Sequence, residues 1–174
     1  MTDIEVLDAI VLFLKENVAS NIKLKKPPED NKIEGKYELV NPAIFSGWLP
    51  HKNYLENYEY DIPGIIVMID NGSDDYDNSL LNIRLKITTY DPGKFDGEKL
   101  TPNMDGYKDL LNIITKIRRE LSQNPIIKEK VSVNKPIDWV MDKEVIYPYW
   151  SADLTFTVNI NSLEFNCESY EKYL

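Results

Sequence analysis

The segment from residue 70 to 78, Asp-Asn-Gly-Ser-Asp-Asp-Tyr-Asp-Asn, holds the side chains best suited to bind a cation. A calcium-binding EF-hand loop needs carboxylates at alternate positions, glycine at the sixth and glutamate at the twelfth. Counted from Asp70, Gly72 is third and the twelfth residue is Leu81, so the EF-hand pattern fails. A solvated turn is the favoured interpretation. Adventitious cation binding and a protein contact remain as alternatives.

The remaining candidates for catalysis are isolated residues. Three carboxylates lie close together in the sequence, and we interpret them as a charged turn rather than an acid–base pair: Asp138, Asp142 and Glu144. Ser46-Gly47 lacks the frame of a nucleophile elbow. Pro92-Gly93-Lys94 lacks the remainder of a phosphate-binding loop. We therefore expect no catalytic residue, no metal and no cofactor, and a protein that is not an enzyme.

The cysteine and histidine counts restrict the chemistry further. Cys167 is the sole cysteine and His51 the sole histidine, so an internal disulfide, a cysteine zinc site and a histidine-pair metal site are excluded for this sequence. His51 is expected in an exposed loop. A reducing cytoplasm is the compartment that this cysteine usage favours.

The charge balance argues against a cationic nucleic-acid binder. The chain has 29 acidic and 20 basic residues among 174, for a net charge of −9. The basic cluster of Lys23, Lys25 and Lys26 is short and adjoins Pro27-Pro28, and we interpret it as a solvated linker. No apolar stretch approaches the ~20 residues of a membrane span, and acidic residues interrupt the apolar N-terminal run, unlike in a signal peptide. We expect no sequence-specific nucleic-acid binding and no membrane partner.

One strand, one turn and one helix form the centre of the predicted fold. Residues 81–87 alternate apolar and polar side chains, as in a half-buried strand. Tyr90-Asp91-Pro92-Gly93 then predicts a turn. From Met104 the apolar residues follow the period of a helix: Tyr107, Leu110, Leu111, Ile114, Ile117 and Leu121.

The other predicted elements surround this centre. Thr2 and Glu5 have the spacing of a capping box at the start of a helix that ends near Ser20. Residues 21–35 and 70–79 are expected to be loops, 37–40 a short strand, and 43–49 a buried segment. The apolar run 62–69 predicts a strand covered on both faces and paired as a hairpin with the strand at 81–87. Val131 and Val133 suggest a short strand, and residues 154–160 alternate cleanly as another. We expect one α/β domain over 1–160 and a C-terminal tail or arm over 161–174.

Aromatic residues gather around Pro148. Tyr147, Tyr149 and Trp150 flank this proline, and Trp139 precedes them. Filling of the core is the favoured interpretation, with a protein interface as the alternative, because Trp and Tyr are enriched at interfaces. Pro148 itself predicts a strand edge or bend.

A series of short motifs in a fixed order resembles a known family. The motifs are Gly47-Trp48-Leu49-Pro50, Ile62 to Val67, Thr89-Tyr90-Asp91, Gly106 to Ile114 with Ile117-Arg118 and Leu121, Pro136 to Trp139, and Tyr147 to Ala152. In this order they resemble the tail-terminator (tail-completion) family of tailed phages. The versions most similar are those of Gram-positive prophages and of phage-tail-like bacteriocins with contractile tails. The chain departs from many relatives at Ser151-Ala152, where glycine often follows the Pro-Tyr-Trp group.

The resemblance implies an α/β (α+β) fold, a mixed or mainly antiparallel sheet with amphipathic helices packed on one face. It implies a structural assembly protein that forms a hexameric ring on the head-proximal end of the tail. The ring would stop polymerisation of tube and sheath and would offer the surface that joins the neck. The implied partners are further copies of the chain, the tail tube protein, the sheath protein and, where a head is present, neck proteins. The protein would pass from the host cytoplasm into the assembled particle.

Two rivals to this function stay open. A neck or head-completion connector has a similar size and composition, and an acidic-loop metal-dependent hydrolase would require a metal at residues 70–77. For the ring, we expect interface residues in the acidic segment, in the loop after Asp91, directly after Pro148 and in the aromatic C-terminal tail. They are Asp70, Asp74, Asp75, Tyr76, Lys94, Phe95, Tyr149, Trp150, Phe165, Tyr170 and Tyr173.

Overall fold

A computed structural model describes residues 2–29, 37–51, 58–75 and 78–162. Its elements are, in order, α1 Asp3–Asn17, the 3-10 helix η1 Ala19–Asn21, β1 Leu24–Lys25, β2 Leu39–Val40, β3 Ala43–Ser46, β4 Gly64–Asp74, β5 Ser79–Tyr90, β6 Lys94–Phe95, β7 Leu100–Thr101, α2 Asp105–Gln123, β8 Ile126–Ile127, β9 Val131–Met141 and β10 Tyr149–Ile160. The predicted capping box is confirmed, because Thr2 N–H donates to Glu5 and Glu5 N–H donates back to Thr2 Oγ1.

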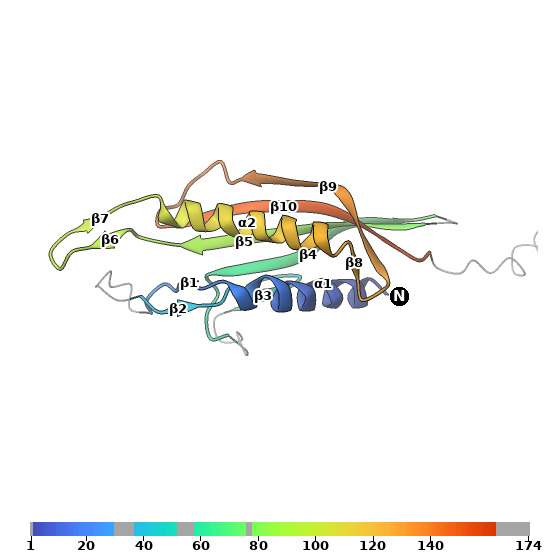
Figure 1. Cartoon of the computed structure of the whole chain (residues 1–174), viewed down its shortest axis with the longest axis horizontal. Helices are drawn as coiled ribbons and strands as arrows, with labels where there is room; N and C mark the ends of the chain where they lie inside the picture. Colours follow the sequence, from blue (N-terminus) through green and yellow to red (C-terminus); the bar gives the residue numbers. More distant parts are fainter. Residues whose placement is uncertain (1, 30–36, 52–57, 76–77, 163–174) are drawn as a thin grey trace, which may run out of the picture.

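A six-stranded sheet in the order β3-β4-β5-β10-β9-β8 forms the centre of the molecule. Only β3 and β4 run parallel; the other neighbours are antiparallel. Two short ribbons, β1-β2 and β6-β7, lie outside this sheet. Figure 1 shows α2 along β5 and β10, and α1 beside β3 and β4.

Both helices cover the same face of the sheet. The alternating apolar residues of β5 are buried, and their partners on β10 are buried with them, for example Leu85 opposite Leu154. Side chains of α1 and α2 join these residues in one hydrophobic cluster. The intervening residues of β5, such as Arg84 and Lys86, therefore lie on the opposite, polar face. This mixed, mainly antiparallel sheet with helices on one face confirms the expected α+β fold class.

The acidic segment after residue 69 is not the loop that its composition predicted. Asp70 to Asp74 continue β4, which pairs with β5 down to Asp74 opposite Ser79. The predicted hairpin is confirmed, but its connection is short. Backbone pairing with a long neighbouring strand extends β4 into polar residues that have no apolar period of their own.

Three other expectations need correction. Residues 21–35 are not entirely a loop, because Leu24 is buried and Leu24–Lys25 pair with β2. Trp48, expected in a buried segment, is 66% exposed. Ile62–Ile69 was expected to be covered on both faces. Within the described part of the chain, Ile66 is the residue of this run that packs into a small cluster on the polar face, with Phe45, Tyr58 and Tyr60.

β9 is a single strand that passes through Pro136 to Met141, whereas the sequence suggested only a short strand at Val131 and Val133. The pairing with β10 shifts between Thr155 and Thr157, which places Pro136 at an irregularity of the ladder. A proline without an N–H is tolerated at such a bulge and on an edge. Pro148 fits its prediction, because β10 begins directly after it.

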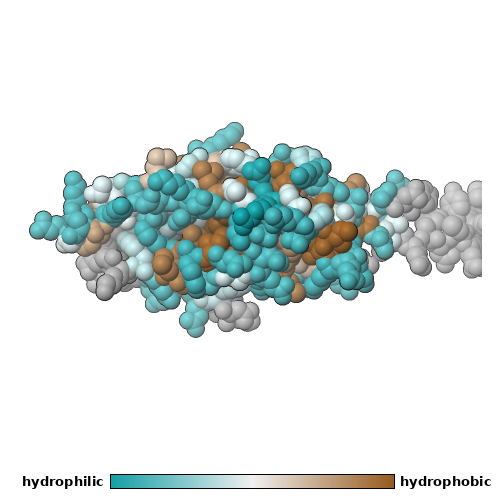
Figure 2. Space-filling model, in the orientation of Figure 1, coloured by the Kyte–Doolittle hydropathy of each residue, from teal (hydrophilic) through white to brown (hydrophobic). Residues whose placement is uncertain are grey.

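Within the described residues, neither helix combines the length and the apolar character needed to cross a membrane. Figure 2 shows a mainly hydrophilic surface interrupted by separate apolar patches.

Candidate functional site

The described interface candidates fall into two groups at opposite ends of the sheet. Asp70, Asp74 and Asp75 lie at the β4–β5 hairpin, whereas Lys94, Phe95, Tyr149 and Trp150 lie at the end where β5 finishes and β10 begins (Figure 1). Four further candidates lie outside the described residues: Tyr76, Phe165, Tyr170 and Tyr173.

The acidic hairpin does not gather its carboxylates around one point. Asp70 accepts from Arg84 Nε at 2.9 and 3.0 Å. Asp74 instead lines a cavity of about 460 Å³ between the hairpin and the start of α1. Across the part of the chain that the structure describes, no group of three or more His, Cys, Asp or Glu side chains has the arrangement of a metal site. Asp70 therefore serves an ion pair.

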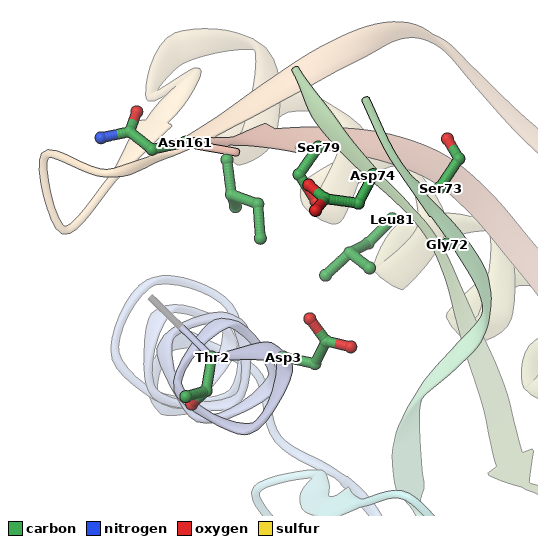
Figure 3. Close-up of a pocket in the computed structure, with 9 residues that line it drawn as sticks. Thr2, Asp3, Gly72, Ser73, Asp74, Ser79, Leu81 and Asn161 are labelled. Carbon is green, nitrogen blue, oxygen red and sulfur yellow. The ribbon is translucent and has the colours of Figure 1, made fainter. Parts of the chain in front are cut away.

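Figure 3 shows this cavity, with Asp3 reaching in from α1 and Asp74 from β4. Its other walls include Thr2, Ser79 and Leu81, and among the described residues no Lys or Arg side chain lines it. With two carboxylates and no cation, this described lining gives the cavity a negative potential. It is therefore a poor site for an acidic ligand.

The polar face of the sheet carries a network of ion pairs. Lys86 Nζ lies 2.5 Å from Asp142 and 3.4 Å from Asp153, and Arg84 lies 3.8 Å from Asp153. Ser151 also donates to Asp142 at 2.6 Å. Burial raises the pKa of Asp142, but the hydrogen bonds from Lys86 and Ser151 outweigh it and hold the pKa below its ordinary value. Asp142, considered above as a possible catalytic acid, thus acts in a charge pair.

At the other end, aromatic residues from distant parts of the chain meet in a cluster that we call the aromatic junction. Its members are Tyr37, Tyr90, Tyr107, Tyr147, Tyr149 and Trp150. The ring centroids of Tyr37 and Tyr90 are 5.9 Å apart, those of Tyr90 and Tyr149 5.4 Å, and those of Tyr107 and Trp150 5.8 Å. Burial and the neighbouring tyrosines raise the pKa of Tyr90 far above its ordinary value, so this hydroxyl stays protonated.

Polar contacts join the aromatic junction to the helix and the turn. Thr89 Oγ1 donates to the carbonyl of Gly106 at 2.9 Å, and the N–H of Asp91 donates to the carbonyl of Pro148 at 3.1 Å. The hydroxyl of Tyr147 donates to the carbonyl of Pro92. The end of β5, the start of α2 and the start of β10 are therefore held together.

Asp91 lies at the base of the junction. Its side chain is 2% exposed and pairs at 2.8 Å with Lys25, which is 27% exposed. The same carboxylate accepts from Gly93 N–H at 2.8 Å. The sequence suggested that Lys25 belongs to a solvated linker. The ion pair shows instead that Lys25 is part of the fold.

The junction holds the base of a projecting hairpin, β6–β7. Gly93 has φ +107°, and a Cβ there would meet the carbonyl oxygen of Thr101 at 2.2 Å, so only glycine fits this turn. Beyond it, Lys94 pairs with Thr101 and Phe95 with Leu100. Figure 1 shows this hairpin extending past the end of the sheet. Lys94 is exposed and Phe95 half-buried, so the hairpin presents a cation and an aromatic ring away from the body.

One surface includes Trp139, for which the sequence left a protein interface open, together with residues that the sequence did not single out. Trp139 and Val140 on β9 are exposed, and Arg118, Arg119 and Lys135 lie close by in a groove between α2 and β9. Pro136 was the available signal, because proline in a strand marks an edge.

No protein-family model matches the chain, and no curated protein sequence matches it.

Proposed function

We propose that this protein is a tail terminator, a structural protein whose hexameric ring caps the head-proximal end of a phage or phage-like tail. The ring binds the last subunits of the tube and, in a contractile tail, of the sheath, and so prevents further addition. Where a head is present, the ring joins the neck proteins. The work consists of presenting a shaped surface, without enzymatic turnover, and the protein moves from the host cytoplasm into the particle.

The observation that carries this proposal is the convergence of three of the ordered motifs. Thr89-Tyr90-Asp91, Gly106-Tyr107 and Tyr147 to Ala152 are far apart in the sequence but meet at the aromatic junction. A shared requirement to build one junction is a physical reason for these motifs to occur together in a fixed order. The α+β fold that the resemblance implied also supports the proposal.

The geometry suggests how such a ring operates. A closed ring requires two different contact patches on each subunit, so that each copy binds its neighbour head to tail. The acidic β4–β5 hairpin and the β6–β7 hairpin extend from opposite ends of the sheet (Figure 1). We assign the β6–β7 hairpin, held by the aromatic junction, to the contact with the tail tube.

Deletion of the gene in a strain that makes the particles tests the function. We expect tubes of irregular and excessive length in electron micrographs, and normal lengths after complementation with the intact gene. Tails of normal length that fail to join heads would identify a connector instead. A cryo-electron microscopy map that places this chain away from the head-proximal end would contradict both assignments.

A further inference from the structure

The outer side of β9 is an open strand edge. β9 pairs with β10 along one side, but β8 covers only Val131 and Ser132 on the other. Val133 N–H also donates to the carbonyl of Pro125 at 2.7 Å; among the described residues no strand pairs with the outer side of β9 from residue 134 onward, and Figure 1 shows β9 along the border of the sheet. Such an edge presents unpaired backbone donors and acceptors to another chain.

Only part of this edge is protected. Lysine, proline and bulges are the usual means of blocking an edge, and Lys135 and Pro136 lie together at the irregularity in the β9–β10 ladder. From residue 137 to 141 there is no further lysine or proline, and Asp138 is the one charged side chain. Trp139 is 41% exposed and Val140 59% exposed, an unusual composition for an unprotected edge that faces only water.

A basic groove accompanies the open edge. It has a volume of about 410 Å³ and lies between α2 and β9, lined by Thr115, Arg118, Arg119, Ser122, Lys135 and Ile137. Arg119 contacts Glu120 at 3.4 Å, whereas neither Arg118 nor Lys135 has an ion-pair partner among the described residues. On a chain of net charge −9, this groove is a local positive site and selects an acidic occupant.

We propose that residues 163–174 of a second copy of this chain occupy the groove and add a strand to the edge of β9. This segment carries Glu164, Glu168 and Glu171 against one cation, Lys172. Its first six residues alternate, with Leu163, Phe165 and Cys167 separated by polar side chains, as in a strand with one face buried. Such strand addition obtains affinity from backbone hydrogen bonds and specificity from alternate side chains.

The length of the segment matches the edge. Five residues of β9, from 137 to 141, span about 17 Å at ~3.3 Å per residue, so the twelve residues of the segment exceed what the edge requires. The remaining residues suffice to carry glutamates into the basic groove. The cavity near Asp3 and Asp74, which lies closest to the end of β10, has the wrong charge for the same segment.

A second copy is the favoured donor because of where β10 ends. Asn159 of β10 lies opposite Ser132, at the start of β9, so the segment that follows Ile160 leaves the sheet at the far end from Trp139. To reach the open edge of its own chain, the segment must reverse and pass β8. Donation to a neighbour repeats head to tail, and such an interface generates a ring when the rotation between subunits closes. In this respect the inference rests on the proposed function.

The single native cysteine provides the test. Trp139→Cys and Val140→Cys are made separately in the full chain, where each new thiol is the only partner for Cys167 besides a second Cys167. Neighbouring residues on a strand point to opposite faces, so we expect one variant to form intermolecular disulfides with Cys167 and the other to form far fewer. The readout is the ladder of covalent dimers and longer chains on a non-reducing gel, with mass spectrometry to identify the linked peptides. The unmodified chain and Glu98→Cys, on the projecting hairpin, are the controls.

Charge reversal supplies an independent readout. Arg118→Glu and Arg119→Glu are added to the β9 cysteine variant that forms intermolecular disulfides. Both residues are exposed on α2, and we expect the double change to lower the disulfide yield about tenfold. Glu168→Arg with Glu171→Arg in the same chain restores the yield. Lys108→Glu, an exposed change elsewhere on α2, leaves the yield unchanged.

Each outcome is decisive. A disulfide within one chain, or no disulfide to Cys167 from either β9 thiol, overturns the inference. If tails are overlong after gene deletion but no such disulfide forms, the capping function is supported and strand exchange is contradicted. Intermolecular disulfides together with normal tail lengths after deletion support strand exchange and remove the capping function.

Discussion

Lys25, Asp91 and Asp109 share one charge environment beside the aromatic junction. Lys25 forms its ion pair with the buried Asp91, so its positive charge balances the carboxylate of Asp109 on α2 less completely. Burial raises the pKa of Asp109 above its ordinary value of 3.8, and the charge of Asp91 raises it further against the opposing effect of Lys25. Asp109 is therefore a site where ionisation opposes folding.

This predicts a pH-dependent gain in stability from Asp109→Asn. Between pH 3.8 and the raised pKa, the folded wild type binds more protons at Asp109 than the unfolded chain does, so its free energy of unfolding falls as the pH rises. The deficit persists above that window. We expect Asp109→Asn to be more stable than wild type near neutral pH, with the difference lost below pH 3.8, in urea unfolding measured from about pH 3 to about pH 8. An equal difference at every pH would show that ionisation is not the cause.

The start of α2 meets the start of β10 at Gly106. A Cβ on this glycine would lie 2.4 Å from Cδ1 of Trp150, 2.6 Å from its Nε1 and 2.9 Å from Cβ of Asp91. The indole is rigid and packs against Tyr107, so it cannot move without disturbing the junction. At the scale of elements, this contact sets how closely the helix approaches the sheet.

Gly106→Ala is accordingly expected to destabilise the fold. Alanine favours a helix over glycine by up to about 1 kcal/mol, but overpacking of a close contact costs about 1–3 kcal/mol. We expect a net loss of about 1 kcal/mol in the free energy of unfolding, measured by urea denaturation. Ser122→Ala, exposed on the same helix, should change this value by less than about 0.5 kcal/mol. A stabilised Gly106→Ala variant would mean that Trp150 is free to move.

As a whole, the molecule is an elongated body with a hairpin projecting from each end of its sheet (Figure 1). The core lies between the helices and one face of the sheet, and the projecting β6–β7 hairpin adds little to it. Stability and surface recognition therefore depend on different residues.

Replacement of Lys94 and Phe95 by serine tests this separation. We expect the unfolding free energy to change by less than about 0.5 kcal/mol for exposed Lys94 and somewhat more for half-buried Phe95, because neither belongs to the core. We expect the double variant to fail in restoring normal tail length when it complements the gene deletion. Ile126→Ser with Lys130→Ser, which likewise replaces an apolar residue and a cation, should complement fully. Tails of normal length with the Lys94 and Phe95 double variant would show that these hairpin residues are not needed for the contact with the tube.

Local sequence patterns were sufficient to predict the main elements. The alternation in β5 and β10, the helical period of α2 and the Thr2–Glu5 capping box depend on neighbours within a few residues, so the sequence alone determines them. The tertiary structure decided the rest. Asp70 to Asp74 form a strand because β5 supplies hydrogen bonds and Arg84 supplies a counter-charge, and Lys25 is held in the fold because a carboxylate 66 positions away lies beneath it. Pairings between distant segments leave no local period, and they also created the aromatic junction and the open edge of β9.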